Sequence, residues 1–429
     1  MVTETITPVT QPIMGNITLP GSKSITNRAI LLAALAIGTS ELSGVLFSDD
    51  TLAALSVLQA LGVAIEVDQQ RFTCRIQGVG GEFLYQQAEL YCHESGTLTR
   101  FLLPILAACS GLYRVSAAPS MMARPLAPLL KVLAAQGSEF SFEAEAWHMP
   151  FELTAQGLSG GALSVPLAQS SQFVSGLLMA APYAKAPLQI STGDIARKPY
   201  IKMTIEMMAA FGCSVAVNAG VQATEFEVPI GRYQAQNYAI EPDASTASYF
   251  FAMAALTQGR VTVQGLNANS LQGDLQFLML LEKMGCAVEW SDHHITVQGP
   301  AVLRGLGKVS LSGFSDTFMT LAALVVFADA PTTLTGLAHT RLQESDRVTA
   351  MATELARLGV AVTTTEDSLT IEPGVPIGRV VQGHNDHRIA MSLALVGLKV
   401  PGLVIEGAEC VAKTCPDYFA RLAELTKIH

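Results

Sequence analysis

The sequence predicts an α/β protein built from six copies of a helix–strand–helix–strand unit of about 75 residues each. Two recurring sequence elements predict the repeated unit. The length and composition of the chain predict how many domains the copies form. The chain has 429 residues, of which 50% are hydrophobic and 14% are charged. Such a length exceeds one ordinary core and favours two domains, while such an apolar composition argues against disorder.

The first recurring element is an amphipathic helix that ends in glycine and leads into a short β-branched strand. It reads LSVLQALGVAIEV at residues 55–67 and ELARLGVAVTT at 354–364. The glycines of its five copies are separated by 75, 75, 73 and 74 residues: Gly62, Gly137, Gly212, Gly285 and Gly359. Glycine after the last helical turn is the expected left-handed stop. The tail at 417–428 resembles the helix of a sixth, shortened copy.

The second recurring element is a polar start followed by an apolar helix and a strand. Its six copies begin at Ser22, Ser95, Ser170, Ala244, Ser315 and Asn385. This helix is apolar nearly all round and should be buried, whereas the glycine-stopped helix is amphipathic and should face solvent on one side. Sheets outside a helix bundle, with three copies per domain, satisfy this pattern. A single ring of six copies satisfies it too.

The charge balance and the cysteines narrow the possible function classes. The formal net charge is −10, which disfavours nucleic acid or an anionic membrane surface as a partner. The seven cysteines include no C-x-x-C pair, as expected for free thiols in a reducing cytosol rather than for disulfides or a zinc site. The N-terminal residues lack a signal-peptide pattern, and apolar runs such as 319–328 are too short for a membrane span.

Basic residues stand at the starts of several predicted helices, although the chain is acidic overall. These residues are Lys23, Arg28, Arg124, Arg347 and Arg388, and Lys413 stands just ahead of the last helix. A helix N-terminus is already partly positive, so each added cation opposes the helix dipole by about 0.3–1 kcal/mol. A bound phosphate or carboxylate would offset that cost. Ordinary capped helices with solvated basic side chains are the alternative interpretation.

Nine sequence motifs give the chain a resemblance to a known enzyme family along nearly its whole length. In the family's order and spacing, they are LPGSKSITNRAILLAAL, ARPLAPLL, SSQF, KPYI, EPDASTASYFFA, NSLQGDLQF, QESDR, NDHRIAMSLAL and AKTCPDYF. The chain resembles 5-enolpyruvylshikimate-3-phosphate synthase. The resemblance implies two inside-out α/β barrel domains of three repeats each, with the active site in the interdomain cleft. One domain would combine residues 1–20 with 241–429, and the other would span 21–240.

The resemblance also implies a reaction and its partners. The enolpyruvyl group of phosphoenolpyruvate would pass to the 5-hydroxyl of shikimate 3-phosphate, with release of phosphate. The expected partners are these small anions, without nucleic acid, membrane, metal or organic cofactor. The resemblance further implies a cytoplasmic monomer of the shikimate pathway, which serves aromatic amino acid biosynthesis, and a donor site that glyphosate can occupy.

The resemblance carries the family's functional residues onto matching positions of this chain. Asp316 would accept the proton of the attacking hydroxyl, and Glu344 and Lys23 would exchange protons with the methylene carbon and the leaving phosphate. The residues implied for phosphoenolpyruvate are Lys23, Gly96, Arg124, Gln172, Arg347, Arg388 and Lys413. Those implied for the acceptor are Lys23, Ser24, Arg28, Ser170, Ser171, Gln172, Arg197, Tyr200, Asp316, His339 and Gln343. Helix capping is the alternative role for Asp316 and for the QESDR motif.

Four positions depart from the family pattern. Glu94 stands where the family has a neutral Asn, and a carboxylate there would repel phosphoenolpyruvate and weaken glyphosate binding unless it were paired or protonated. Arg197, His339 and Gln343 replace Ser, Asn and Lys around the acceptor's phosphate. Either Arg197 takes over from the missing lysine, or the acceptor is another cyclic alcohol. A catalytically weak anion-binding relative is a third interpretation.

One related activity is disfavoured by the same resemblance. A sister family enolpyruvylates a nucleotide sugar and carries a reactive Cys in the loop before its ARP motif. The corresponding loop of this chain reads AAPSMMARP and has no cysteine. A nucleotide-sugar acceptor is therefore not expected.

Overall fold

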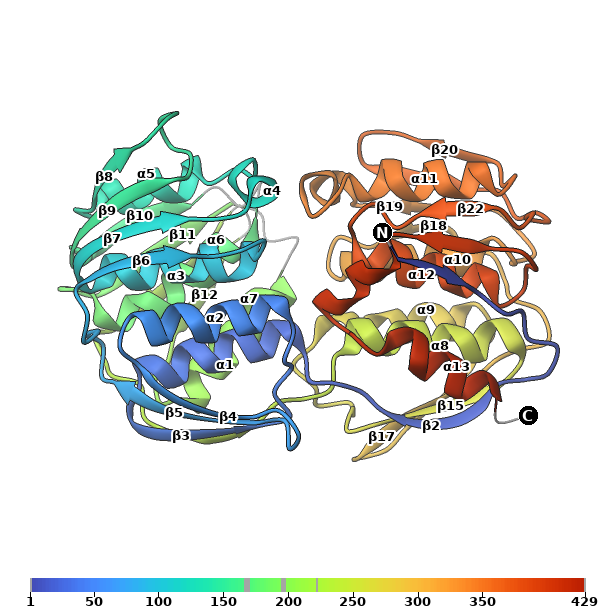
Figure 1. Ribbon diagram of the computed structural model, residues 1–429, viewed down its shortest axis with the longest axis horizontal. Coiled ribbons are helices and arrows are strands. Elements are labelled where there is room, and N and C mark those ends of the chain that lie inside the picture. Colours follow the sequence, from blue (N-terminus) through green and yellow to red (C-terminus); the bar gives the residue numbers. More distant parts are fainter. Residues whose placement is uncertain (1, 166–169, 194–197, 221–222, 428–429) are drawn as a thin grey trace. The chain divides into compact units, whose positions relative to one another are not determined.

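The computed structural model describes residues 2–165, 170–193, 198–220 and 223–427. The contacts between residues divide the chain into two units. Unit 1 combines Met1–Pro20 with Glu241–His429, and unit 2 is Gly21–Ile240. In each unit the strands lie on the outside and the helices lie between the sheets (Figure 1).

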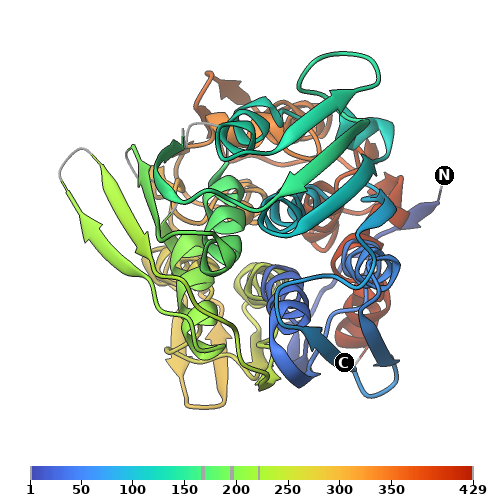
Figure 2. The ribbon, with the colours of Figure 1, turned by 90° about the vertical axis from the view of Figure 1, so that its left-hand side faces the viewer.

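Unit 2 holds, within its described residues, three sheets around its helices (Figure 2). Their spatial orders are β14-β3-β5-β4, β6-β7-β9-β8 and β10-β11-β13-β12. The strands are β3 (Ile37–Ser43), β4 (Ala64–Asp68), β5 (Thr73–Val79), β6 (Gln87–Tyr91), β7 (Ser110–Ser116), β8 (Glu139–Phe142), β9 (Phe151–Gln156), β10 (Gly161–Val165), β11 (Leu188–Thr192), β12 (Ala216–Ala219), β13 (Thr224–Val228) and β14 (Asn237–Ala239). The α-helices are α1 (Lys23–Leu35), α2 (Asp49–Ala60), α3 (Gly96–Ala108), α4 (Pro119–Met122), α5 (Ala127–Ala135), α6 (Ser171–Ala180) and α7 (Lys198–Ala210).

Neighbouring repeats of unit 2 exchange one strand. The strand β6 ends the first repeat but pairs in parallel with β7 of the second, and β10 ends the second but pairs with β11 of the third. The strand β14 ends the third repeat and returns to pair in parallel with β3 of the first. Each repeat therefore adds its last strand to the sheet of the next, and the third repeat adds its last strand to the sheet of the first.

Unit 1 has the same design, but it needs strands from both ends of the chain. Within its described residues, the spatial orders are β16-β17-β15-β2, β18-β19-β21-β20 and β1-β23-β22. The strands are β1 (Thr3–Thr5), β2 (Met14–Thr18), β15 (Arg260–Gln264), β16 (Ala287–Trp290), β17 (His294–Gln298), β18 (Gly307–Ser310), β19 (Thr332–Thr335), β20 (Val362–Thr364), β21 (Ser368–Ile371), β22 (Val380–Gln382) and β23 (Val404–Glu406). The α-helices are α8 (Ala244–Thr257), α9 (Phe277–Lys283), α10 (Phe318–Val325), α11 (Arg347–Arg357), α12 (His387–Gly397) and α13 (Tyr418–Lys427).

The N-terminal strands complete the shortened sixth repeat. The strand β2 pairs in parallel with β15 and fills the place of the last strand that the sixth repeat lacks, while β1 pairs antiparallel with β23. Unit 1 therefore closes on itself after three repeats, as unit 2 does. The predicted arrangement of three repeats per domain is confirmed, and the alternative ring of six copies is wrong.

The apolar helices form the interior of each unit, as their composition predicted. Every residue of α8 and α12 is buried, and so is every residue of α1 except Ser24. The glycine-stopped helices α2 and α11 bury one face and expose the other. All five stop glycines have φ between +87° and +104°, which confirms the predicted left-handed stops.

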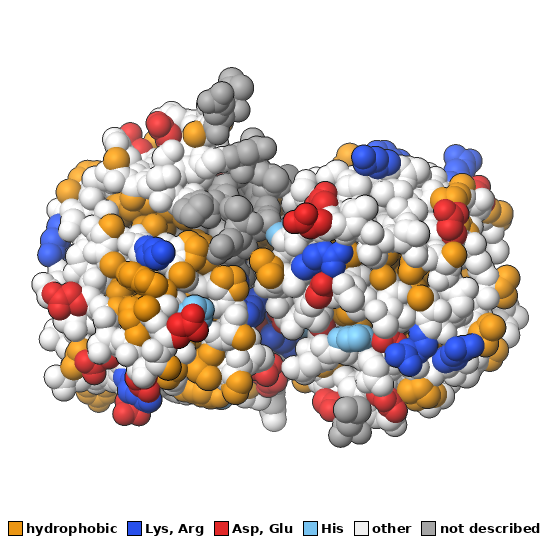
Figure 3. Space-filling model, turned by 90° about the horizontal axis from the view of Figure 1, so that it is seen from above, with side chains coloured by type: hydrophobic (Ala, Val, Ile, Leu, Met, Phe, Trp, Pro, Cys, Tyr) orange, Lys and Arg blue, Asp and Glu red, His pale blue; other side chains and the backbone are white. Residues whose placement is uncertain are grey.

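The surface carries both signs of charge. On the face seen in Figure 3, basic and acidic side chains are interspersed over both units. None of the helices among the described residues combines the length and apolar character that a membrane crossing requires. All seven cysteines are free thiols, and six of them are buried.

Gly359 allows a test of backbone strain without a steric clash. It has φ +87°, and no heavy atom of a described residue beyond its chain neighbours lies within 4 Å of an added Cβ. We expect Gly359→Ala to lower the free energy of unfolding by about 1–2 kcal/mol, measured by urea unfolding. Gly374 has equally open surroundings without a positive φ, so Gly374→Ala should be neutral or slightly stabilising. Equal effects of the two substitutions would contradict the left-handed stop.

Candidate functional site

A buried ion pair in unit 1 joins the starts of two helices. Asp346 caps α11 by accepting the Thr349 N–H at 3.0 Å, which places Arg347 in the first turn. Arg347 is 2% exposed, and its Nε lies 2.8 Å from Oδ2 of Asp386, which is 0% exposed. Asp386 also caps α12, because its Oδ1 accepts the Arg388 N–H at 3.0 Å. The Asp386 carboxylate therefore joins the start of α11 to the start of α12.

Asp316 lies between the two arginines of this pair of helices. It belongs to a 3-10 turn that precedes α10. Its Oδ1 is 3.0 Å from Nη1 of Arg347, and its Oδ2 is 2.9 Å from Nη2 of Arg388. Both oxygens thus face guanidinium groups that come from other segments, so the alternative of a plain helix cap does not describe this aspartate.

Glu344 is held by two cations. One of its oxygens accepts a hydrogen bond from Nη2 of Arg347, and the other is 3.7 Å from Nζ of Lys413. Lys413 ends a 3-10 helix that precedes α13. Burial alone would lower the pKa of Arg347, but the three carboxylates around it, Asp386 foremost, raise that pKa above its ordinary value.

The formal charges in this cluster balance. Its cations are Arg347, Arg388 and Lys413, and its carboxylates are Asp316, Glu344 and Asp386. Two of the positions that depart from the family pattern lie beside it. His339 Nε2 is 2.8 Å from the Ser315 hydroxyl, and the Gln343 amide oxygen accepts a hydrogen bond from Arg347. An arriving anion would compete with the carboxylates for the three cations.

Arg28 forms a separate cluster in unit 2. It is 2% exposed, and its Cζ lies 4.7 Å from the ring centroid of Phe101. Its guanidinium donates to the Ser24 carbonyl at 2.9 Å, the Tyr200 carbonyl at 3.3 Å and the Thr204 hydroxyl at 2.7 Å. Burial lowers the pKa of Arg28 to about 10. Within the described part of the chain, this cation has no carboxylate at ion-pair distance.

Gln172 ties the start of α6 to α3. Ser170 caps α6 by accepting the Gln172 N–H at 3.2 Å, and the buried Ser171 is the first residue of the helix. The Gln172 Oε1 accepts from Nη1 of Arg100 at 2.7 Å, and its Nε2 donates to the Thr97 hydroxyl at 2.9 Å. The glutamine is thereby fixed by hydrogen bonds at both ends of its amide.

Gly96 begins α3 directly against Arg124. A Cβ on Gly96 would lie 2.6 Å from Nη1 of Arg124, so a larger residue would displace the guanidinium. Arg124 lies between α4 and α5 and not at a helix start, which corrects the expected position. Its Nε is buried without a hydrogen-bond partner among the described residues, and its Nη1 lies 3.8 Å from the Met121 Sδ. Arg124 as a whole is half-buried, and a guanidinium with unused donors suits an anion-binding group.

Lys23 opens α1, as predicted. Its Nζ lies 3.4 Å from Oδ2 of Asp50, and the two side chains are 11% and 5% exposed. Asp50 stands in the first turn of α2, where an acid complements the helix dipole. The cation at one helix start is therefore balanced by an acid at the start of the next.

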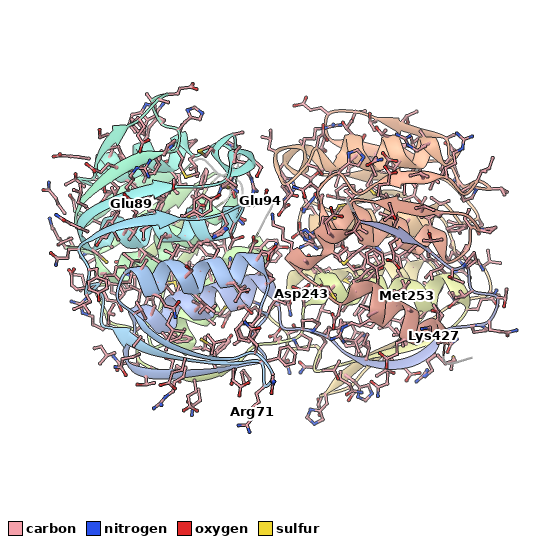
Figure 4. The ribbon with its side chains drawn as sticks, in the orientation of Figure 1. Arg71, Glu89, Glu94, Asp243, Met253 and Lys427 are labelled. Carbon is pink, nitrogen blue, oxygen red and sulfur yellow. The ribbon has the colours of Figure 1, made fainter. Side chains whose placement is uncertain are left out.

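Glu94 lies just before the start of α3 and is exposed. Figure 4 labels it together with Glu89, which precedes it in the chain and belongs to β6. Its Oε1 accepts a hydrogen bond from the Ser120 hydroxyl at 3.1 Å. The described partner of this carboxylate is thus a hydroxyl and not a cation.

The contacts bring most of the predicted residues into a few groups. Asp316, Glu344, Arg347, Arg388, Lys413 and Gln343 form one; Arg28 contacts Ser24 and Tyr200; Gln172 contacts Ser170; Gly96 contacts Arg124; Lys23 pairs with Asp50; and His339 contacts Ser315. Arg197 lies outside the described residues. No described set of three His, Cys, Asp or Glu side chains is arranged to hold a metal ion.

Three neighbours of these groups were not expected from the sequence: Asp50, Arg100 and Asp386. A signal existed for Asp386, because it stands directly before a predicted helix, where Asp is a favoured cap. Arg100 lies one turn inside its helix, much as Arg28 does, so comparison of the repeats could have found it. For Asp50 the only signal in the sequence was an acidic residue at a helix start, which is a common feature and does not indicate a site.

Comparison with known proteins gives consistent matches along the whole chain. A family model described as EPSP synthase (3-phosphoshikimate 1-carboxyvinyltransferase) matches residues 8–422. The 3-phosphoshikimate 1-carboxyvinyltransferase of Nostoc punctiforme is 42% identical over 417 residues, which cover 97% of this chain and 97% of that protein. The 3-phosphoshikimate 1-carboxyvinyltransferase 2 of Halalkalibacterium halodurans is 42% identical over 422 residues, which cover 97% and 93%.

A solved structure agrees with these sequence matches. EPSP synthase from Acinetobacter baumannii matches with a TM-score of 0.83 and 29% identity, covering 99% of this chain and 97% of that one. Sequence and structure thus point to the same relatives over nearly the full length. The chain therefore belongs to the EPSP synthase family, the 3-phosphoshikimate 1-carboxyvinyltransferases.

Proposed function

We propose that this chain transfers the enolpyruvyl group of phosphoenolpyruvate to the 5-hydroxyl of shikimate 3-phosphate and releases phosphate. The observation that carries the proposal is the meeting of Arg347, Arg388 and Lys413, which come from three different segments, around two partly exposed carboxylates. Phosphoenolpyruvate bears a phosphate and a carboxylate, so its binding needs several cations held close together. Membership of the family supports the same reaction.

The donor is assigned residues of both units. The proposed set is Lys23, Gly96, Arg124, Gln172, Arg347, Arg388 and Lys413. Arginine suits this role because its planar fork matches the oxygens of phosphate and carboxylate groups. The unused Nε donor of Arg124, and the lack of room for a side chain at Gly96, support their assignment to this anion.

The acceptor is assigned a second, partly overlapping set. It comprises Lys23, Ser24, Arg28, Ser170, Ser171, Gln172, Arg197, Tyr200, Asp316, His339 and Gln343. Arg28 would face the acceptor's carboxylate, and its burial without a carboxylate partner among the described residues supports that role. The assignment of Arg197 rests on the family resemblance alone.

Two carboxylates and a lysine are assigned the proton transfers. Protonation of C3 of phosphoenolpyruvate makes C2 cationic, and the acceptor's hydroxyl oxygen then attacks C2 while Asp316 accepts its proton. The tetrahedral ketal that results loses a C3 proton and its phosphate, which restores the double bond. Glu344 is assigned the C3 proton, because Arg347 and Lys413 hold it beside the expected phosphate position. Lys23 is assigned to the leaving phosphate.

A different cyclic alcohol is the second candidate acceptor. His339 and Gln343 stand where the family has Asn and Lys. The Gln343 amide oxygen accepts a hydrogen bond from Arg347, a contact that adds no positive charge for an acceptor phosphate. Loss of a lysine at position 343 and gain of an arginine at position 197 nearly conserve the charge but move it, and this displaced charge favours an altered acceptor.

We infer that the enzyme works as a monomer in the cytoplasm. Its seven cysteines are free thiols, which suits a reducing compartment. The monomeric state is suggested by the family resemblance.

Asp274 is a buried carboxyl that interacts electrostatically with the unit 1 cluster. It lies in a 3-10 helix before α9 and accepts a hydrogen bond from the Ser245 hydroxyl. Burial raises the pKa of Asp274 from 3.8 to about 7, the negative charge of Asp316 adds to this rise, and Arg388 opposes it. The folded protein therefore keeps this carboxyl protonated to a higher pH than the unfolded chain does.

Release of phosphate from phosphoenolpyruvate in the presence of shikimate 3-phosphate tests the proposed reaction. We expect turnover only with both substrates, and we expect Asp316→Asn to lower kcat by about 10²–10⁴-fold, the usual contribution of a general base. Asp292→Asn changes an exposed aspartate of the same unit and should leave kcat unchanged. Release with another cyclic alcohol, but not with shikimate 3-phosphate, would favour the second candidate. If no alcohol led to release of phosphate, the proposal that this chain is an enzyme would be contradicted.

Asp274→Asn should change the pH dependence of stability. Because the pKa of Asp274 is higher in the folded protein, its ionisation destabilises the fold increasingly as the pH rises from 3.8 to about 7. We expect the substitution to raise Tm by about 2–4 °C at pH values above about 7.5 and to have little effect near pH 4, measured by calorimetry. Asp292→Asn provides the control, and a gain in Tm that is the same at every pH would argue against this explanation.

Glu94→Asn should strengthen the binding of glyphosate. The substitution removes a negative charge from a position that the resemblance places beside the donor, and one charge near a surface contributes about 1 kcal/mol or more. We expect the inhibition constant for glyphosate to fall by about threefold to tenfold. Glu89→Gln on β6 is the matched control and should leave the constant unchanged (Figure 4). An inhibition constant that Glu94→Asn does not alter would refute the hypothesis.

A further inference from the structure

A second buried charge lies on the face of α11 that carries Arg347. Glu354 follows Arg347 by seven residues, which is two helical turns, so the two side chains share one face of the helix. Glu354 is 0% exposed. A glutamate is almost never fully buried unless it is paired, and its partners therefore indicate what it holds.

Both carboxylate oxygens of Glu354 reach the segment just before α12. Its Oε1 lies 2.8 Å from Nε2 of His384, and its Oε2 accepts the backbone N–H of Gln382 at 3.2 Å. Its third partner, Nε of Arg357 at 3.0 Å, belongs to α11 itself and to a side chain that is 45% exposed. Two of the three contacts thus tie α11 to segment 382–386.

Segment 382–386 has a backbone that needs such contacts. His384 and Asn385 have φ of +53° and +51°, the left-handed region that residues with side chains seldom adopt. These two residues turn the chain from β22 into α12, where Asp386 caps the helix and Arg388 follows. Backbone of this kind persists only where the surrounding structure fixes it. Glu354 supplies two of the fixing contacts.

We propose that Glu354 is a positioning residue, which fixes the turn through Gln382 and His384 and so sets Arg388 beside Asp316. This inference rests on the proposed function, because the residue that Glu354 positions, Arg388, is one of those proposed to bind the donor's phosphate and carboxylate. Arg347 holds the far end of the same segment through Asp386, so α11 contacts the segment at two points, two helical turns apart.

The state of the Glu354 carboxyl agrees with this role. Burial alone would raise the pKa of Glu354, but the hydrogen bonds from His384 and Gln382 lower it below its ordinary value. The group is therefore ionised near neutral pH, and hydrogen bonds to an ionised acceptor are stronger than neutral ones.

Glu354→Met tests the proposal, because it keeps much of the side-chain volume and removes both acceptor oxygens. We expect amide hydrogen exchange at residues 382–388 to become about tenfold faster or more, while exchange elsewhere in unit 1 changes little. We expect KM for phosphoenolpyruvate to rise by about tenfold to a hundredfold, with a smaller change in kcat. Glu354→Gln can still accept the Gln382 N–H, so its effects should lie between those of Glu354→Met and the unchanged protein.

Two further variants keep the proposal falsifiable. Arg357→Gln removes only the partner on α11 and should leave both the exchange and KM unchanged. His384→Ala removes one contact from a side chain that is 31% exposed, and it serves if Glu354→Met fails to fold. It should change exchange and KM in the same direction as Glu354→Met, and the two effects should not add in the double variant.

Three outcomes would overturn the proposal. They are unchanged exchange at residues 382–388, faster exchange with an unchanged KM, and an equal rise of KM in Arg357→Gln. Exchange is measured without substrate, so it decides whether Glu354 holds the segment even if the unchanged protein fails to use phosphoenolpyruvate. Absence of turnover in the unchanged protein would count against the proposed function instead.

Discussion

The site in unit 1 depends on the buried carboxylate of Asp386. It accepts hydrogen bonds from the Arg347 side chain, the Ser345 hydroxyl and the Arg388 backbone at distances of 2.8–3.0 Å. Breaking a buried pair of this kind typically costs about 3–5 kcal/mol, because the remaining charge stays buried without compensation. The loss would spread here, since Arg347 is also the group that holds Asp316 and Glu344. One desolvated carboxylate thus fixes the geometry of both proposed proton-transfer groups of this unit.

The two units prepare for anions in different ways. The cations of unit 1 are matched by carboxylates, so a ligand there would replace a partner that already exists. In unit 2, Arg28 is buried and Arg124 is half-buried with a buried Nε, and neither has a carboxylate at ion-pair distance among the described residues. Burial of an uncompensated cation costs free energy, which a bound anion would offset. In unit 1, the carboxylates Asp316 and Glu344 accompany the cations as proposed proton-transfer groups, whereas in unit 2 the group proposed for proton transfer, Lys23, is itself a cation.

Features that depend on the local chain could be predicted from the sequence, and features that depend on pairing between separate segments could not. Gly359 could be recognised because a left-handed helix stop favours glycine wherever the helix lies. The buried helices could be recognised by their apolar composition, and Arg347 and Arg388 by the motifs around them. The partnership of Asp386 with Arg347, and that of Asp50 with Lys23, joins separate segments and leaves no periodic signal. Asp316 shows the limit of prediction best. Both a helix cap and an ion-pair partner favour aspartate at this position, so the sequence could not distinguish the two roles.

The pairing of β2 with β15 affects how the chain folds during its synthesis. Between Thr18 and Arg260 the ribosome must add 241 residues, which takes on the order of 10–50 s at about 5–20 residues per second. Unit 2 lies wholly within that interval, and all its strands are present once β14 has emerged. The strands β1 and β2 are thus made before unit 2 but find their partners only after it, β2 with β15 and β1 with β23. The later-finished unit begins its synthesis first, and its leading strands remain unpaired while the inserted unit folds.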